Sequence, residues 1–199
     1  MSESREVDAD DASVIERSRR EPEAFAEVFR RYAPDIKRYV MRRLGADAAE
    51  DVVAETFLAA FRQRDRYDLT RANARPWLYG IATNLMGRHV RTEVQQLRVL
   101  ERMGTDPVMA SFTERSDERL SAAASRRALA GALARLPAGH RDALLLVAWG
   151  DLSYTEAAQA LNVRVGTVRS RINRARTKLR KQLGATPSVN FVCEEPVHE

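Results

Sequence analysis

The stretch Ser153–Arg176 constrains the fold of this chain more than any other feature of its sequence. Ser153 and Glu156 have the spacing of a capping box, in which a serine hydroxyl and a glutamate carboxylate satisfy the amides that begin a helix. The polar cluster Asn162–Arg164 then interrupts the helical pattern as a short turn would, and a second helix is predicted to begin near Gly166. Two helices joined by such a turn predict a helix-turn-helix.

The second of these helices has two faces of different character. Val168, Ile172, Ala175 and Leu179 recur at intervals of three and four residues, which places them on one buried stripe. No Asp or Glu occurs between Arg164 and Leu183. The outward arc consists of polar and basic residues: Arg169, Ser170, Arg171, Asn173, Arg174, Arg176, Lys178, Arg180 and Lys181.

The single charge sign of this helix indicates a nucleic-acid partner. A solvated helix normally mixes acidic and basic residues, because opposite charges one turn apart are mildly stabilising. DNA phosphates would supply the missing counter-charge, and Arg and Asn side chains can read base edges in the major groove. An ordinary basic solvated face is the alternative interpretation. The formal charge of the whole chain is +5 although both ends are acidic, so the middle is more basic than the total.

Composition excludes several classes of protein. The apolar runs are shorter than the roughly 18 residues that span a bilayer, and the acidic N-terminus does not fit a secretory signal, so we expect a cytoplasmic protein without membrane insertion. His89, His140 and His198 are scattered and Cys193 is the only cysteine, so no metal or other cofactor is expected. Cys193 is interpreted as an unconstrained tail thiol, with a redox role left open.

Helical periodicity extends over most of the chain. Apolar residues from Phe25 to Val40 follow helical spacing, Gly45 ends that run, and Asp47 begins another. Pro34 is expected to kink or split the first of these helices. The pair Arg75-Pro76 suits the first turn of a third helix. These helices predict one compact bundle.

The predicted fold class is all-α, with two small helical domains joined by a flexible linker, the second domain carrying the helix-turn-helix. A turn at Pro137-Ala138-Gly139 is expected inside the second domain. The predicted ranges are a disordered acidic tail (1–20), a first domain (21–98), a linker (99–119), a second domain (120–184) and a C-terminal tail (185–199).

Three segments together resemble the extracytoplasmic-function, or group IV, sigma factors of the sigma-70 superfamily. They are DAAEDVVAETFLAAF (Asp47–Phe61), RPWLYGIATNLMGRH (Arg75–His89) and the segment Leu133–Arg180, which begins LARLPAGHRD. Proteins of this family are initiation subunits of bacterial RNA polymerase. The resemblance implies a protein that binds the polymerase core and promoter DNA, helps promoter melting, and is held inactive by an anti-sigma factor. It implies no enzymatic activity in this chain.

The resemblance also implies residue roles. The helix after Gly45 matches the surface for the polymerase clamp helices, with candidate residues Glu50, Asp51, Glu55 and Phe57. The loop Asp68–Ala74 and the following helix match the part that captures a flipped base of the minus-ten element, with candidate residues Arg71, Asn73, Trp77 and Asn84. The second domain matches the reader of the minus-thirty-five element, with Arg169, Ser170, Asn173 and Arg174 on bases and Arg176 and Arg180 on phosphates.

Some of these positions have simpler interpretations. The acidic helix can be a solvated face over a core that contains Phe57, and Trp77 can pack in a core. Gly80 departs from the family, in which a longer and often basic residue is usual, and glycine inside a helix costs about 1 kcal/mol relative to alanine.

Two other functions remain possible from the residues alone. A stand-alone helix-turn-helix regulator would use the first bundle for dimerisation or sensing, and would bind paired half-sites without polymerase. An enzyme is less favoured, because the sequence offers no nucleophile-base pair, metal cluster or phosphate loop. The acidic ends of the chain could also screen the basic surface.

Overall fold

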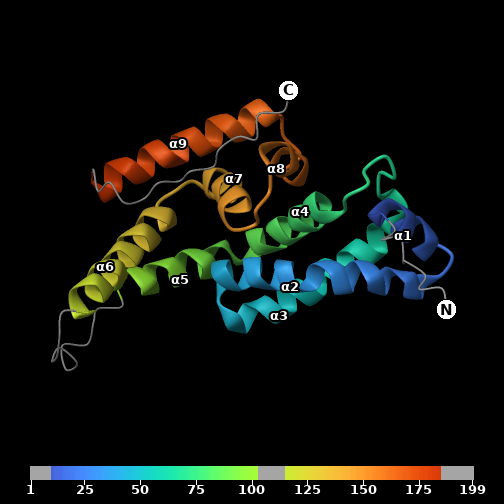
Figure 1. Ribbon diagram of the computed structural model, residues 1–199, viewed down its shortest axis with the longest axis horizontal. Helices are drawn as coiled ribbons and strands as arrows, with labels where there is room; N and C mark the ends of the chain where they lie inside the picture. Colours follow the sequence, from blue (N-terminus) through green and yellow to red (C-terminus); the bar gives the residue numbers. More distant parts are fainter. Residues whose placement is uncertain (1–9, 103–114, 185–199) are drawn as a thin grey trace, which may run out of the picture.

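The computed structural model describes residues 10–102 and 115–184 of the 199-residue chain. Within those ranges the regular structure is helical and contains no strand (Figure 1), as predicted for an all-α fold. Residues 1–9 of the predicted N-terminal tail, the centre of the predicted linker, the C-terminal tail and Cys193 lie outside the described residues.

The first domain consists of five α-helices. They are α1 (Asp11–Ser18), α2 (Phe25–Leu44), α3 (Ala46–Gln63), α4 (Arg75–Met86) and α5 (Val90–Arg102), with short 3-10 turns at Pro22–Ala24, Arg64–Arg66 and Gly87–His89. Helix α2 packs against α1, α3 and α4, and α3 packs against α4. Fully buried side chains such as Ile36, Tyr39, Leu44 and Leu78 form the centre of this bundle.

Helix α1 corrects the prediction of a disordered tail through residue 20. The side chain of Asp10 accepts a hydrogen bond from the backbone amide of Ser13 at 2.8 Å, which caps the first turn of α1. Val14 and Ile15 are 1% and 0% exposed, so helix α1 contributes to the core of the first domain. The adjacent apolar residues Val14 and Ile15 indicate this helix in the sequence, but they follow acidic residues that are typical of a disordered tail.

Three further details differ from the sequence prediction. Helix α2 runs unbroken past Pro34, so the proline does not split it, whereas Gly45 ends α2 as predicted, with a φ of 83° that suits glycine. Helix α3 begins at Ala46, one residue before the predicted start. Pro137 is the N-cap of α7, so Ala138 and Gly139 begin a helix instead of completing a turn.

The second domain consists of α6 (Arg115–Ala134), α7 (Ala138–Ala148), α8 (Tyr154–Ala160) and α9 (Val165–Leu183). The predicted capping box is present, because the Ser153 hydroxyl accepts from the Glu156 amide and the Glu156 carboxylate accepts from the Ser153 amide. Asn162 has a φ of 50° in the turn between α8 and α9. The helix-turn-helix therefore forms as the sequence predicts.

The two domains contact each other along α4 and α5. Helix α5 packs against α6, and α4 packs against α8, the first helix of the helix-turn-helix (Figure 1). Since α5 continues to Arg102 and α6 begins at Arg115, both described ends of the predicted linker are helical.

Candidate nucleic-acid interface

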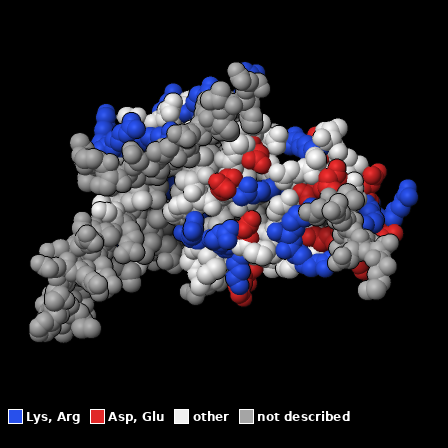
Figure 2. All heavy atoms as spheres, viewed as in Figure 1, with Lys and Arg blue, Asp and Glu red and all other residues white. Residues whose placement is uncertain are grey.

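Helix α9 presents one buried stripe and one cationic face. Val168, Ile172, Ala175 and Leu179 are at most 1% exposed, as their spacing predicts. Because these four side chains point into the second domain, the remaining positions of α9 face outward. The exposed candidates for DNA contact are Arg169, Ser170, Asn173, Arg174 and Arg180, while Arg176 is half-buried. Figure 2 shows Lys and Arg side chains along the upper edge of the molecule, over α9.

The start of α7 lies beside this positive surface. A Cβ atom at Gly139 would lie 3.4 Å from the guanidinium carbon of Arg171, so α7 begins directly beside α9. Burial lowers the pKa of His140, and the nearby charges of Lys178, Arg174 and Arg171 lower the pKa further. Three cations of α9 therefore disfavour the charged form of His140 at the edge of the candidate DNA surface.

The loop Asp68–Ala74 directly precedes α4 in the chain, and hydrogen bonds fix its conformation. The carboxylate of Asp68 accepts from the amide of Thr70 at 3.1 Å and from its hydroxyl at 2.6 Å. These hydrogen bonds with Thr70 lower the pKa of Asp68. The hydroxyl of Tyr67 donates to the carbonyl of Arg71 at 2.6 Å. Arg71 and Asn73 remain exposed on this loop.

Trp77 and Asn84 lie seven residues apart, which brings them to the same face of α4. The ring of Trp77 packs against the ring of Tyr67 with centroids 4.9 Å apart, and the side chain is half-buried. Trp77 thus has a packing role within the first domain. Asn84 is exposed, and its amide can donate and accept hydrogen bonds.

Polar contacts join this part of the first domain to the second. The side-chain amide of Asn73 donates to the Glu156 carboxylate at 3.3 Å. Arg75 donates to the backbone carbonyls of Gly150 and Asp151 at 2.8 Å and 3.0 Å, at the end of α7. Residues predicted near the minus-ten pocket therefore contact the helix-turn-helix domain in this structure.

A buried ion pair forms a further contact between the domains. Arg43 of α2 donates to the carboxylate of Asp142 in α7 at 2.6 Å and to the hydroxyl of Tyr39 at 2.9 Å. Arg43 is only 3% exposed. Such a charge is stable in a protein interior only when it is paired and hydrogen-bonded.

The acidic candidates of α3 lie on an exposed face that is crossed by ion pairs. Lys37 of α2 donates to Glu50 at 2.9 Å, and Arg88 donates to Glu55 at the same distance. The hydrogen bond from Lys37, followed by its charge, lowers the pKa of Glu50. Asp51 is exposed between these two glutamates.

Phe57 differs from the other candidates of α3 because it is only 5% exposed. Its ring packs edge-on against Phe29 of α2, with centroids 4.8 Å apart. Phe29 itself is 46% exposed, although it belongs to the helically spaced apolar residues between Phe25 and Val40. A hollow of about 530 Å³ lies between α2 and α3, and its lining includes Phe29, Val53 and Ala54. Phe29 is therefore the aromatic side chain that this surface offers, and sequence spacing alone did not identify it.

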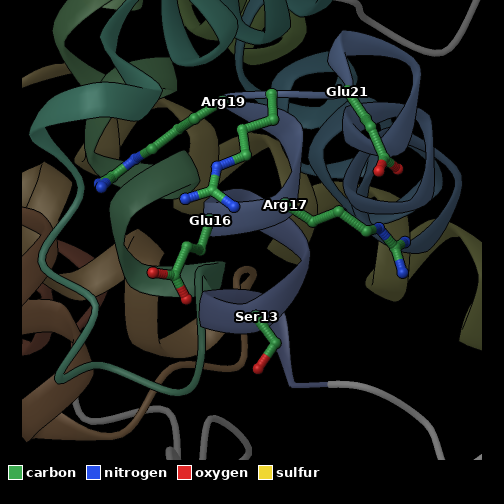
Figure 3. A pocket seen from close by; sticks show the side chains of 6 residues that line it. Ser13, Glu16, Arg17, Arg19 and Glu21 are labelled. Atoms are coloured by element: carbon green, nitrogen blue, oxygen red, sulfur yellow. The ribbon is translucent and has the colours of Figure 1, made fainter.

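A second hollow lies beside α1, and Figure 3 shows Ser13, Glu16 and Arg17 on that helix. Arg19 extends from the end of α1 to the carbonyl of Asp65 at 3.1 Å, just after α3. This hydrogen bond places a cation near the carbonyl end of α3, which ties the two helices together.

Within residues 10–102 and 115–184, no three His, Cys, Asp or Glu side chains gather as a metal site would require. None of the described helices is both long enough and apolar enough to cross a membrane.

A helical bundle joined to a helix-turn-helix domain with a cationic recognition helix defines a class of DNA-binding transcription proteins. Residues 28–95 match the sequence profile of Sigma-70 region 2, and residues 126–179 match that of Sigma-70, region 4.

Sequence alignments with known sigma factors cover most of the chain. The ECF RNA polymerase sigma factor SigW of Bacillus subtilis is 32% identical over 169 residues, which span 81% of this chain and 89% of that protein. The RNA polymerase sigma factor CarQ of Myxococcus xanthus is 31% identical over 163 residues, which span 81% and 90% of the two chains. This chain belongs to the ECF RNA polymerase sigma factors and functions in transcription initiation.

Two solved structures have a similar fold. CnrH, in complex with the cytosolic domain of CnrY, has a TM-score of 0.61 and 27% identity, covering 88% of this chain and 97% of CnrH. The sigma factor RpoE, in complex with the anti-sigma factor NepR from Bartonella quintana, has a TM-score of 0.54 and 22% identity. That match covers 81% of this chain and 98% of RpoE, and it bears on the fold alone.

Proposed function

We propose that this sigma factor reads two promoter elements, one with each domain. Helix α9 binds the duplex of the minus-thirty-five element, and the loop Asp68–Ala74 together with α4 binds the minus-ten element as it melts. The observation that carries the proposal is the outward face of α9, which is rich in Lys and Arg and contains no acidic residue. The phosphates of the promoter duplex are the counter-charge that we propose for these cations.

On α9 the proposed roles follow from side-chain chemistry. Arg169, Ser170, Asn173 and Arg174 are exposed on the first three turns and make hydrogen bonds to base edges. Arg176 and Arg180 lie further along the helix and contact phosphates, which fixes the position of the domain without specifying sequence.

At the minus-ten element, Asn84 and Asn73 make hydrogen bonds to an extruded base, and Arg71 contacts the backbone beside it. Base extrusion costs a few kcal/mol of lost stacking and pairing, so the receiving pocket has to be rigid. Trp77 supplies that rigidity, because it packs against Tyr67 and also presents part of its ring at the surface.

The polymerase core binds the face formed by α2 and α3. Glu50, Asp51 and Glu55 give this face its acidic rim, and the adjacent hollow exposes Phe29. Phe57 supports the face from beneath. Exposed aromatic side chains surrounded by charged residues are typical of protein interfaces.

The chain itself carries no catalytic step in this proposal, since RNA synthesis belongs to the polymerase and requires no cofactor of the sigma factor. Its place of action is the cytoplasm, where it meets core polymerase. We also propose an anti-sigma partner, by analogy with CnrH, whose structure was solved in complex with the cytosolic domain of another protein, CnrY.

Run-off transcription from a promoter library tests this function. Bacterial core polymerase is assayed with and without the full chain, and the transcripts are sequenced. We expect transcripts that depend on the chain and come from promoters with two enriched sequence blocks at a fixed spacing. Specific DNA binding by the chain alone, without such transcripts, would instead identify a stand-alone regulator.

A further inference from the structure

Asp11 connects helix α1 to the loop proposed to capture the minus-ten base. The residue lies outside the range that matches Sigma-70 region 2, which begins at residue 28. Its carboxylate is nevertheless one of the few buried acidic groups described here, with 2% of the residue exposed. A buried carboxylate is expected to have specific partners, because an unpaired charge is unstable in a protein interior.

The partners of Asp11 lie at the end of the loop Asp68–Ala74. One carboxylate oxygen accepts from the backbone amide of Ala74 at 2.7 Å. The backbone amide of Asp11 donates to the carbonyl of Ala72 at 3.1 Å. Since Ala74 is the N-cap of α4 and its own side chain offers no cap, Asp11 supplies a negative charge at the start of α4.

Helix α2 holds the same carboxylate from the other side. Arg31 forms an ion pair with Asp11, and the hydroxyl of Tyr32 donates to Asp11. Asp11 thereby connects α1, α2 and the last residues of the loop through one buried charge. Charge-assisted hydrogen bonds of this kind are stronger than neutral ones.

The two halves of the loop depend on different contacts. The first half is held locally, because Asp68 binds Thr70 and Tyr67 binds Arg71. In the second half, Asn73 accepts a hydrogen bond from the amide of Arg75 at 2.8 Å, and Asp11 holds the residues on either side of Asn73.

We propose that Asp11 is a positioning residue for promoter melting: it fixes Ala72 and Ala74 so that Asn73 and the start of α4 receive the extruded base. This inference rests on the proposed minus-ten function of that segment. It predicts a defect in melting while binding to the polymerase core and to the minus-thirty-five duplex remains normal. The α2 contacts of Asp11 are Arg31 and Tyr32, which do not line the hollow between α2 and α3, and α9 belongs to the other domain.

The test uses holoenzyme reconstituted with the full chain on a promoter recovered from the run-off library. The fluorescent base 2-aminopurine in the minus-ten element reports melting, and separate titrations measure affinity for core polymerase and for the minus-thirty-five duplex. The variants are Asp11→Ala and Asp11→Asn, the second of which keeps an oxygen to accept the Ala74 amide. Glu16→Ala is the matched control, since Glu16 is an exposed carboxylate on the same helix.

We expect Asp11→Ala to lower the equilibrium constant for melting by about tenfold or more, the loss expected for one hydrogen bond to a charged group. Asp11→Asn should lie between Asp11→Ala and the unchanged chain, and Glu16→Ala should match the unchanged chain. Normal melting by both Asp11 variants would overturn the inference, and so would an equal loss of core affinity and melting in Asp11→Asn. If the unchanged chain itself produces no melting, the proposed function fails instead.

Discussion

The backbone of Gly80 in α4 lies so close to Ala160 in α8 that a Cβ atom at position 80 would be 2.6 Å from the Ala160 carbonyl oxygen. This contact lies where the two domains meet, and it gives a physical reason for the glycine. A side chain of any length at position 80 would separate α4 from α8. Gly80 therefore permits the close packing of the helix-turn-helix domain on the first domain.

Gly80→Ala is expected to loosen the contact between the domains. Alanine is favoured over glycine inside a helix by about 1 kcal/mol, so without the Ala160 contact the substitution would stabilise α4. With the contact, the backbone carbonyl has to move, and we expect a larger radius of gyration by small-angle X-ray scattering. Gly87→Ala is the matched control, because a Cβ atom there meets nothing within 4 Å. An unchanged radius in Gly80→Ala would refute the role assigned to this glycine.

Asp142→Asn is expected to weaken the same contact from α7. The substitution removes the negative partner of the buried Arg43, and breaking a buried ion pair from one side costs about 3 kcal/mol. Chemical unfolding should show this loss, with the second domain unfolding before the first. The control is Asp35→Asn, which breaks the more exposed pair with Arg38 and should cost less than about 1 kcal/mol. Equal costs for Asp142→Asn and Asp35→Asn would show that the ion pair between the domains contributes little.

Arg174→Ala and Arg180→Ala should have different effects on DNA binding. We expect the first to lower affinity for the correct minus-thirty-five duplex by about 1–3 kcal/mol and to leave binding to unrelated duplex nearly unchanged. The second should weaken binding to every duplex and reduce the slope of log affinity against log salt by about one. Salt titrations of holoenzyme on matched and scrambled duplexes distinguish these outcomes. A uniform loss from both variants would contradict the proposed division between base and phosphate contacts.

DNA binding should become tighter as the pH falls because of His140. Its pKa lies below the ordinary value of 6.5 in the unbound protein, where burial and the α9 cations disfavour the charged imidazole. Phosphates that approach these cations reduce their effect, so binding raises the pKa of His140 and takes up a proton. We expect duplex affinity to increase between about pH 7.5 and about pH 5.5, and to increase less in His140→Gln. Identical pH profiles would place His140 outside the DNA surface.

The lowered pKa of His140 makes folding stability decrease as the pH falls, which is opposite to its effect on DNA affinity. The unfolded chain binds a proton at His140 before the folded chain does, because the folded pKa is lower. The contribution of this residue to stability is therefore complete above pH 6.5 and declines as the pH falls through the lowered value. Thermal unfolding of the unchanged chain and of His140→Gln should differ most at low pH, because only the unchanged chain then carries a charged imidazole beside the α9 cations.

The helix-turn-helix was predictable because its signals are local. Ser153 and Glu156 are three residues apart, and the stripe from Val168 to Leu179 follows one helical period, so neither depends on distant residues. Helix α1 is difficult to predict because the buried Val14 and Ile15 follow a run of acidic residues, whose composition is typical of a disordered tail. The resemblance to a family, and not the periodicity, supplied the candidate residues of the first domain.

The contacts between domains could not be predicted in the same way. In the sequence, Gly80 is only a departure from the family pattern. The close approach that requires glycine there involves the carbonyl of a residue 80 positions further along the chain. Arg43 and Asp142 are likewise ordinary helix residues until α2 and α7 are placed side by side. Phe29 follows the spacing of buried residues, but the hollow between α2 and α3 leaves it exposed. Such features depend on how helices meet in space.

The hydrogen bonds from Asn73 and Arg75 to the second domain have a consequence for promoter choice. DNA that binds the proposed minus-ten segment must compete with a partner that belongs to the same molecule and never diffuses away. The measured affinity for any promoter then equals the affinity of the molecules with separated domains multiplied by the fraction of such molecules. DNA of random sequence offers phosphates but few good base contacts, so its binding energy separates the domains less effectively. With the proposed minus-ten role of this segment, docking of the two domains would favour DNA that carries both elements.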